Sequence, residues 1–361
     1  MNDGLGPLAR PVTAAIRAGH AWSVRHQRSE SWREMARMTG VIMRYFRPGQ
    51  GPGTPAELIP LLRLPLGTWL PVGDQALAGL VILGDDDRLT DATYDIGCAY
   101  TVELLAGQED PGARWLPSWR THRAEQVENA VFRRLLNGTD EDYTAGRRFL
   151  VEHPAGATAE LLTWQAALGV QPSASYGPIP HHQQWNGWWW PCPLCRWPMS
   201  VTSSALVKCR FAPHEAVYTL LSSGRLQPVT GAPRITGALP VQGAACVDES
   251  TWRYIVVPGA VEVRLNDRIN ALPGVSTRLY PDKDRCDIAV HAGERELTLD
   301  VKDYGSATAL AARLSAHPIA ADLLVLPQYR REQLPELRRL LPGPPPVTEE
   351  QIYRRIRKGL S

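Results

Sequence analysis

The chain has 361 residues, of which 44% are hydrophobic and 21% are charged. Such a chain is long enough for two or three units with hydrophobic cores, and its composition excludes wholesale disorder. The formal net charge of +2 gives no overall field that would attract nucleic acid, so any basic surface must be local.

The first 20 residues lack the charged and then apolar profile of a secretory signal, and the sequence has no run of 18 or more apolar residues. These features predict a cytoplasmic protein with no membrane partner. Of the six cysteines, four lie in or near one cluster, and Cys98 and Cys286 are scattered. This distribution fits a reducing compartment better than a framework of disulfides.

The N-terminal part, residues 1–170, is predicted to be mainly helical. Its apolar and aromatic residues recur at helical spacing, and the segments end at Gly or Pro. The predicted helical segments are residues 21–46, 124–138, 140–154 and 157–169. The apolar runs at residues 81–84 and 98–105 fit either short buried strands or helix, and periodicity leaves this open. Residues 171–184, rich in Pro, Gly, Ser and His, are predicted to form a linker.

A cysteine cluster follows, in which Cys192 and Cys195 have C-x-x-C spacing and Cys209 and His214 complete a set of four. Two knuckle-like turns of this kind hold a tetrahedral structural Zn²⁺ that leaves no open position for catalysis. Cys246 is the alternative fourth ligand, and a disulfide or redox C-x-x-C is the competing interpretation. The flanking sequence is turn-like, with no thioredoxin-like βαβ pattern, so we favour zinc.

Four tryptophans lie within residues 185–190, directly before the cysteine cluster. Exposed rings could stack on unpaired bases. We expect these rings instead to pack the small zinc-binding segment against its neighbours, because four tryptophans carry a large apolar surface that must be buried.

Residues 258–327 read in order as a capped amphipathic helix (258–272), three strands, a helix (306–316) and the apolar strand 321–327. This is an αβββαβ order. The short segment AGERE reads as the turn of a hairpin between two of the strands. We therefore expect an α/β fold in this part of the chain.

The hairpin places acidic and basic side chains at one end of two paired strands. Asp287 opens one strand, and Asp300 and Lys302 end the next, on the same face because strand side chains alternate. Two carboxylates can hold Mg²⁺ or Mn²⁺, and the lysine then points at the water that attacks a phosphodiester. Asp282 and Asp284 are alternative aspartates, but they lie in a polar turn. Taken alone, the step from Asp300 to Lys302 could be an exposed strand end with a salt bridge.

On these residues and this element order, the chain resembles the PD-(D/E)xK restriction-endonuclease-like superfamily. The resemblance implies a metal-dependent endonuclease in which Asp287 and Asp300 bind the metal and the backbone carbonyl of Val301 completes its coordination. It places Glu262, on the first helix, as an outer or second-metal ligand. Lys302 acts on the water.

The segments YTAGRRFLVEHP, CRWPM, TWRYIVVPGAVEVRL, YPDKDRCDIAV and LTLDVKDYGS together resemble the endonuclease-fold protein of bacterial PIWI-RE (pPIWI-RE) defence modules. This resemblance implies a PIWI-domain protein and a helicase as partners, nucleic acid as substrate with DNA favoured, and action against plasmids or phage. The alternative is a catalytically inactive adaptor that binds nucleic acid and assembles with a partner.

We therefore expect a multi-domain α/β protein with a helical region at 1–170, a zinc-ribbon-like segment at 185–225 and a nuclease domain at 250–361. The last of these ends in a tail rich in Arg and Lys. That tail could bind phosphates with an affinity that falls as salt concentration rises, or it could be a solvated helix face.

Overall fold

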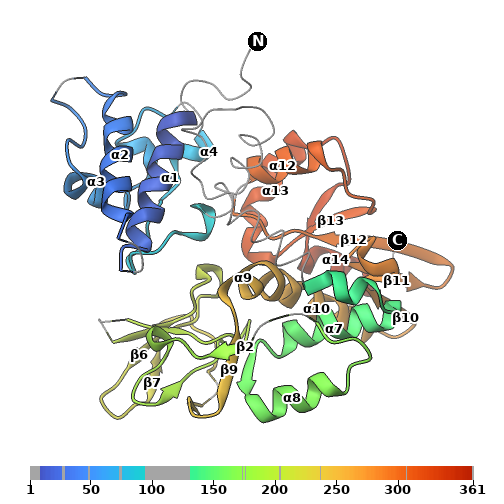
Figure 1. The fold of residues 1–361 in the computed structure, drawn as a ribbon. Helices are drawn as coiled ribbons and strands as arrows, with labels where there is room; N and C mark the ends of the chain where they lie inside the picture. The colour runs from blue at the N-terminus through green and yellow to red at the C-terminus, as the bar shows by residue number, and fades with distance from the viewer. Residues whose placement is uncertain are drawn as a thin grey trace. The chain divides into compact units, whose positions relative to one another are not determined.

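The computed structural model describes residues 9–26, 29–47, 49–72, 75–93, 131–172, 174, 176–202, 205–235, 237–305 and 307–359. The chain divides into two compact units. The first unit comprises Met1–His122 and Tyr304–Arg313, and the second comprises Arg123–Asp303 and Leu314–Ser361. Helices and several sheets occur together (Figure 1), so the predicted mixed α/β class is confirmed.

The first unit is built around a pair of helices, α1 (Ala9–Ser23) and α2 (Ser31–Met43), which pack on each other. Between them, Arg17 and Glu34 form a buried ion pair with an N–O distance of 2.7 Å. The segment predicted to be helical at 21–46 breaks after α1, where the residues are polar and offer no apolar stripe. The other helical segments here are α3 (Pro55–Leu61), a 3-10 turn (Leu66–Thr68) and α4 (Gln75–Ala78).

The undecided run at 81–84 forms neither a helix nor a regular strand. Ile82 and Leu83 are buried, and Leu83 makes one isolated antiparallel bridge with Leu89. The second undecided run, 98–105, lies outside the described residues.

Two predicted helices, α7 (Asp140–Glu152) and α8 (Thr158–Ala166), open the described part of the second unit together with a helical turn at 131–136. Helix α7 starts at a capping box, in which Thr139 and Asp142 each bond to the other's backbone N–H. This arrangement satisfies donors that a helix start leaves unpaired. Both helices group with the second unit, although the expected N-terminal region extends to residue 170.

The segment predicted as a linker at 171–184 contains a strand. This strand, β2 (Tyr176–Pro178), pairs with β9 (Ala244–Val247), which also pairs with β1 (Ala155–Ala157) in a three-stranded antiparallel sheet. The linker prediction was wrong here, because the Pro- and Gly-rich composition does not report the pairing of Tyr176–Pro178 with β9. The Tyr176 hydroxyl donates a 2.7 Å hydrogen bond to the carbonyl of His153.

The cysteine-rich region forms small antiparallel sheets. One contains four strands in chain order, β4 (Ser200–Val201), β5 (Leu206–Lys208), β6 (Val217–Leu220) and β7 (Leu226–Pro228). The other pairs β3 (Trp188–Trp189) with β8 (Leu239–Pro240). Trp189 and Trp190 are buried, whereas Trp188 is 45% exposed. Packing therefore accounts for most of this tryptophan cluster, as expected.

The C-terminal sheet has the order β10-β11-β12-β13-β14. The first three strands are antiparallel, and β13 and β14 add in parallel to β12. The strands are β10 (Val275–Leu279), β11 (Ile288–Ala292), β12 (Arg295–Val301), β13 (Leu323–Leu326) and β14 (Pro346–Thr348). The predicted hairpin is present, with Ala292 paired to Arg295 and Gly293 at a φ of 61° in the turn. A positive φ is a conformation that glycine adopts without strain.

The helix before this sheet is α10 (Val257–Asn270), and α12 (Ala307–Ala316) lies between β12 and β13 in sequence, as in the expected αβββαβ order. The sequence predicts a capping side chain at the start of helix α10, but the structure has none there. Instead the helix continues from α9 (Glu249–Thr251) through a π-helical turn (Trp252–Val256), which supplies the preceding carbonyls. A short kinked helix, α11 (Pro281–Asp284), lies between β10 and β11.

Helix α10 packs against β10, β11 and β12, and α14 (Glu349–Arg357) packs against α10 and β13. The core between them contains aliphatic side chains such as Leu265, Ile288, Val325 and Ile352. A 3-10 segment (Gln328–Gln333) and α13 (Leu334–Leu340) precede β14. Across the described ranges, no helix has the length and apolar character needed to cross a membrane.

Candidate active site and metal centre

Two carboxylates lie side by side where β11 begins and β12 ends. The backbone N–H of Asp287 donates to the carbonyl of Leu299 at 3.1 Å, and the N–H of Val301 donates to Asp287 Oδ2 at 2.6 Å. These bonds fix Asp287 beside Asp300, and both residues are buried. The structure therefore brings together the two aspartates that the hairpin was expected to pair.

Lys302 lies against both carboxylates. Its Nζ forms a close ion pair with Asp300 Oδ1 and is 4.0 Å from Asp287 Oδ2. Burial alone would lower the pKa of Lys302, but the charges of Asp287 and Asp300 outweigh burial and raise it. The lysine is therefore a protonated hydrogen-bond donor at this site.

The oxygen atoms present fit a hard divalent cation. Asp300 Oδ1 is buried, and the Lys302 ammonium is its ion-pair partner. Burial and the neighbouring charge of Glu262 raise the pKa of Asp287, which is the effect that a bound cation would reverse. Because the N–H and C=O of one strand residue point to the same side, the carbonyl of Val301 is expected to face Asp287 as well. Oxygen-only donors of this kind suit Mg²⁺ or Mn²⁺.

Glu262 on α10 is buried and accepts two hydrogen bonds on a single oxygen. Its Oε2 accepts from the hydroxyl of Tyr280 at 2.6 Å and from Nη2 of Arg147 at 3.0 Å. Burial raises the pKa of Glu262. Two donors on Oε2 leave that atom poorly placed to bind a metal directly.

The two alternative aspartates pair with arginines and not with Lys302. Asp282 is exposed and pairs with Arg285 at 3.1 Å and with Arg278 at 3.6 Å. Asp284 is also exposed and forms a close ion pair with Arg147. Asp287, by contrast, shares the Lys302 ammonium with Asp300.

Sequence reasoning missed one residue of this site, Arg147 of α7. Its Nη2 is 3.0 Å from Glu262 Oε2 and 3.9 Å from Asp287 Oδ1, while Nη1 contacts Asp284. The guanidinium carbon lies 3.9 Å from the centroid of the Tyr280 ring, and the residue is 7% exposed. Burial alone would lower the pKa of Arg147, but the surrounding acidic groups raise it. A buried, permanently charged cation thus lies among three carboxylates.

A signal for Arg147 exists in the sequence. Tyr143, Arg147 and Leu150 recur at the i, i+4, i+7 spacing of one helix face, and all three are buried. An arginine on an otherwise apolar helix face needs a buried acidic partner. That pattern indicates an ion pair, but it does not indicate which carboxylate lies opposite.

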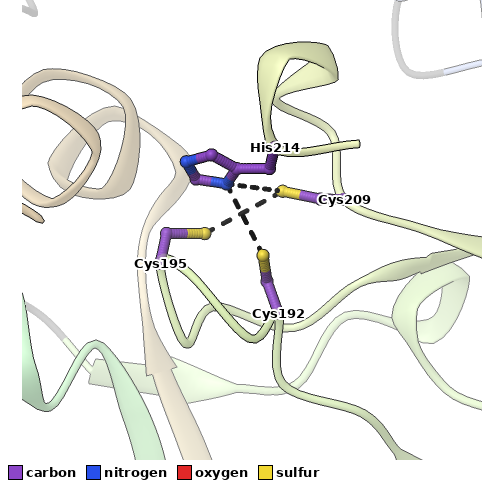
Figure 2. A group of neighbouring side chains, drawn as sticks. All are labelled: Cys192, Cys195, Cys209 and His214. Atoms are coloured by element: carbon purple, nitrogen blue, oxygen red, sulfur yellow. Dashed lines mark hydrogen bonds between the residues drawn. The ribbon is translucent and has the colours of Figure 1, made fainter. Parts of the chain in front are cut away.

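The second predicted cluster assembles as a compact set of four buried ligands (Figure 2). Cys192 and Cys195 come from one turn, and Cys209 and His214 come from another, with their sulfur and nitrogen atoms pointing at a common centre. All four ligand atoms lie within 4.8 Å of one another. Cys246 is not a member of this group; it lies in β9. His214 therefore takes the fourth position, as favoured from sequence.

The distances in this cluster match a tetrahedral zinc site. The separations are 3.9 Å for Cys195–Cys209, 3.5 Å for Cys192–His214 and 3.4 Å for Cys209–His214, the last two measured to Nδ1. Bonds to zinc of about 2.0–2.3 Å give tetrahedral edges of roughly 3.3–3.8 Å. All five cysteines in the described part of the chain are free, so the competing disulfide is not formed there. The cluster can hold a metal such as zinc.

The thiols of this cluster differ in ionisation. Burial raises the pKa values of Cys195 and Cys209. For Cys192, burial acts in the same direction, but hydrogen bonds from the other ligands lower its pKa well below the usual value. A bound divalent cation would supply the charge that ionises all three thiols.

Part of the C-terminal cationic tail is neutralised within the chain. Arg330 Nε is 2.9 Å from Asp303 Oδ1, and Arg354 Nε is 2.8 Å from Glu350 Oε1. Glu350 also accepts from Arg268 at 2.9 Å. Local ion pairs thus account for some of the positive charge that could otherwise grip phosphates.

Comparison with known proteins gives matches to two family models. Residues 259–358 match a family described as "REase associating with pPIWI_RE", and residues 8–157 match one described as "pPIWI_RE three-gene island domain Y". Searches of curated proteins and of solved structures gave no significant match. Glu262, Asp287, Asp300 and Lys302 all fall within the first match, and Arg147 falls within the second. The chain therefore carries an REase-like region and a domain Y region, both of which associate it with pPIWI-RE modules.

Proposed function

We propose that this chain is a Mg²⁺- or Mn²⁺-dependent endonuclease that hydrolyses nucleic-acid phosphodiester bonds, with DNA as the favoured substrate. The observation that carries this proposal is the pair of buried carboxylates, Asp287 and Asp300, with the ammonium of Lys302 against both. DNA is favoured because the matched family is described as an REase.

Each side chain has a distinct role in this proposal. Asp287 and Asp300, with the carbonyl of Val301, would hold the metal, which when bound polarises the phosphoryl oxygen and stabilises the charge that develops there. The N–H of Val301 keeps Asp287 oriented through its 2.6 Å hydrogen bond. Lys302 donates hydrogen bonds that orient the attacking water toward the phosphorus.

The four-ligand cluster has a structural role in the same proposal. Three cysteines and one histidine close a tetrahedral zinc site and leave no position for a water or a substrate. Zinc bound there would hold the two ligand-bearing turns together and so stabilise the small sheets around it.

The proposed biological role is defence against invading nucleic acid such as plasmids or phage. Support comes from the two family descriptions, which name pPIWI-RE and a three-gene island. We propose that the partners are a PIWI-domain protein and a helicase. The PIWI-domain protein would bring the nuclease to its target.

A cleavage assay tests the proposal. Purified protein is incubated with MgCl₂ or MnCl₂ and with single- and double-stranded DNA and RNA, alone and with the pPIWI-RE protein of its module. We expect metal-dependent cleavage of DNA that EDTA abolishes and that an Asp300→Asn protein lacks. Binding of nucleic acid and of the partner without cleavage in any metal would instead favour the inactive adaptor.

A further inference from the structure

Arg147 lies between two buried carboxylates of the candidate active site. Its Nη2 bridges Glu262 Oε2, at 3.0 Å, and Asp287 Oδ1, at 3.9 Å. We propose that the Arg147 guanidinium replaces a second divalent metal at this site, so that the nuclease uses one catalytic metal and one built-in cation. This inference rests on the proposed nuclease function and specifies how many divalent ions its catalytic site binds.

The guanidinium is fixed in place from several directions. Its carbon lies 3.9 Å from the Tyr280 ring centroid and 5.3 Å from that of Phe132, and its Nη1 contacts Asp284. A side chain held by two rings and three carboxylates has few alternative rotamers. It therefore cannot move aside for a metal without breaking buried ion pairs.

The charges around the site lead to the same conclusion. Four carboxylates, those of Glu262, Asp284, Asp287 and Asp300, are linked through the two cations Arg147 and Lys302. With every group ionised, four negative and two positive charges leave a formal charge of −2. One divalent ion balances this charge. A second divalent ion would face an arginine at close range and would be repelled.

Glu262 contributes to the same arrangement. Its Oε2 already accepts from Arg147 and from Tyr280 at 2.6 Å. Through this oxygen, Glu262 holds Arg147 in place. Glu262 and Arg147 come from different family-matched regions, so the complete site requires both regions of the chain.

Counting bound Mn²⁺ tests this proposal without relying on cleavage. Zinc-loaded protein is titrated with Mn²⁺, and free Mn²⁺ is followed by electron paramagnetic resonance. The soft thiolate cluster does not retain Mn²⁺ in competition with zinc. We expect one Mn²⁺ per chain in the wild type, and two in Arg147→Met and Arg147→Gln, which remove the charge. Arg147→Lys keeps the charge and should return the count to one.

Two further variants serve as controls. Arg148→Met changes the next residue of α7, whose ion pairs with Glu152 and Asp267 lie away from the site, and should bind one Mn²⁺. Asp300→Asn should weaken Mn²⁺ binding at least tenfold. Zinc content and circular dichroism report whether each variant is folded.

The outcomes separate the inference from the proposed function. Two Mn²⁺ ions per wild-type chain would overturn the inference and leave the nuclease proposal standing, and this result needs no variant to fold. A single Mn²⁺ per chain in folded Arg147→Met and Arg147→Gln proteins would also overturn the inference. No Mn²⁺ binding by the wild type would overturn the nuclease proposal and the inference with it.

Discussion

The indole Nε1 of Trp252 donates a hydrogen bond to Cys195 Sγ at 3.3 Å. Trp252 also stacks on Trp197, with ring centroids 4.4 Å apart and an interplanar angle of 14°. It is the first residue of the π-helical turn that continues into α10, the helix that carries Glu262. The metal cluster is therefore connected directly to the start of a helix of the candidate active site.

The Trp252 hydrogen bond can be tested with Trp252→Phe, which keeps an aromatic ring against Trp197 but removes the N–H donor. We expect a loss of about 0.5–1.5 kcal/mol in the free energy of unfolding, added to the cost of the smaller ring. Zinc content should be unchanged. Chemical denaturation measures the effect, and Trp164→Phe, at a 41% exposed position, is the control. An equal change in both variants would argue against a specific contribution from the bond.

The cluster should contain about one zinc per chain by elemental analysis, as one tetrahedral site requires. Cys195→Ser removes a ligand and should lower both the zinc content and the thermal stability. A cost of about 3 kcal/mol corresponds to a fall in Tm of roughly 6–12 °C for a unit of this size.

The matched control for this zinc prediction is Cys246→Ser, because Cys246 is equally buried but lies outside the cluster. It should retain its zinc. A wild-type protein that is stable and free of metal would contradict the assignment of a zinc site.

The parts of the site that could be predicted from sequence are local. Asp287 and Asp300 are separated by a single hairpin, so strand periodicity and the turn at Gly293 bring them together. Cys192 and Cys195 likewise share one short turn, and Cys209 and His214 share another. In such segments the backbone geometry of one element, which sequence patterns report, determines which side chains meet.

The contacts that sequence did not reveal join distant segments. Arg147 meets Glu262 across 115 residues of sequence, and no periodicity within α7 or α10 encodes which helices pack together. The strand at Tyr176 was missed for a similar reason, since its pairing with β9 is a tertiary contact that composition does not report. The start of α10 also depends on the π-helical turn before it, where a side-chain cap was expected.

The metal-binding prediction concerns Asp300. Asp300→Asn keeps the size of the side chain but removes a charged ligand, so the metal would no longer be held at the reacting phosphate. We expect cleavage to fall by roughly 10³-fold, the equivalent of several kcal/mol of transition-state stabilisation. Nucleic-acid affinity, measured by fluorescence anisotropy, and Tm should stay close to wild type. Cleavage at the wild-type rate would show that this hairpin does not bind the catalytic metal.

The last prediction concerns Lys302 and distinguishes an enzyme from an inactive adaptor. If Lys302 only neutralised the two buried carboxylates, Lys302→Arg, which keeps the charge, would leave cleavage intact, and Lys302→Ala would mainly lower stability, because it leaves buried charges unpaired. If it orients the attacking water, Lys302→Ala and Lys302→Arg should both keep metal and nucleic-acid binding. Both should lose cleavage by about 10²- to 10⁴-fold. Arginine fails as a substitute because its planar donors are placed differently.

Single-turnover cleavage rates measure the effect of the Lys302 variants. The matched control is Lys283→Ala. The Nζ of Lys283 donates to the carbonyl of Leu136 at 2.9 Å, whereas Lys302 is the lysine that pairs with Asp287 and Asp300. The cleavage rate of Lys283→Ala should remain within a few-fold of wild type, since an exposed cation contributes little to a reaction that it does not touch. If Lys302→Ala cleaves at the wild-type rate while Asp300→Asn is inactive, the proposed metal site stands but Lys302 has no role in the reaction. Unchanged rates in both would place the catalytic centre elsewhere in the chain.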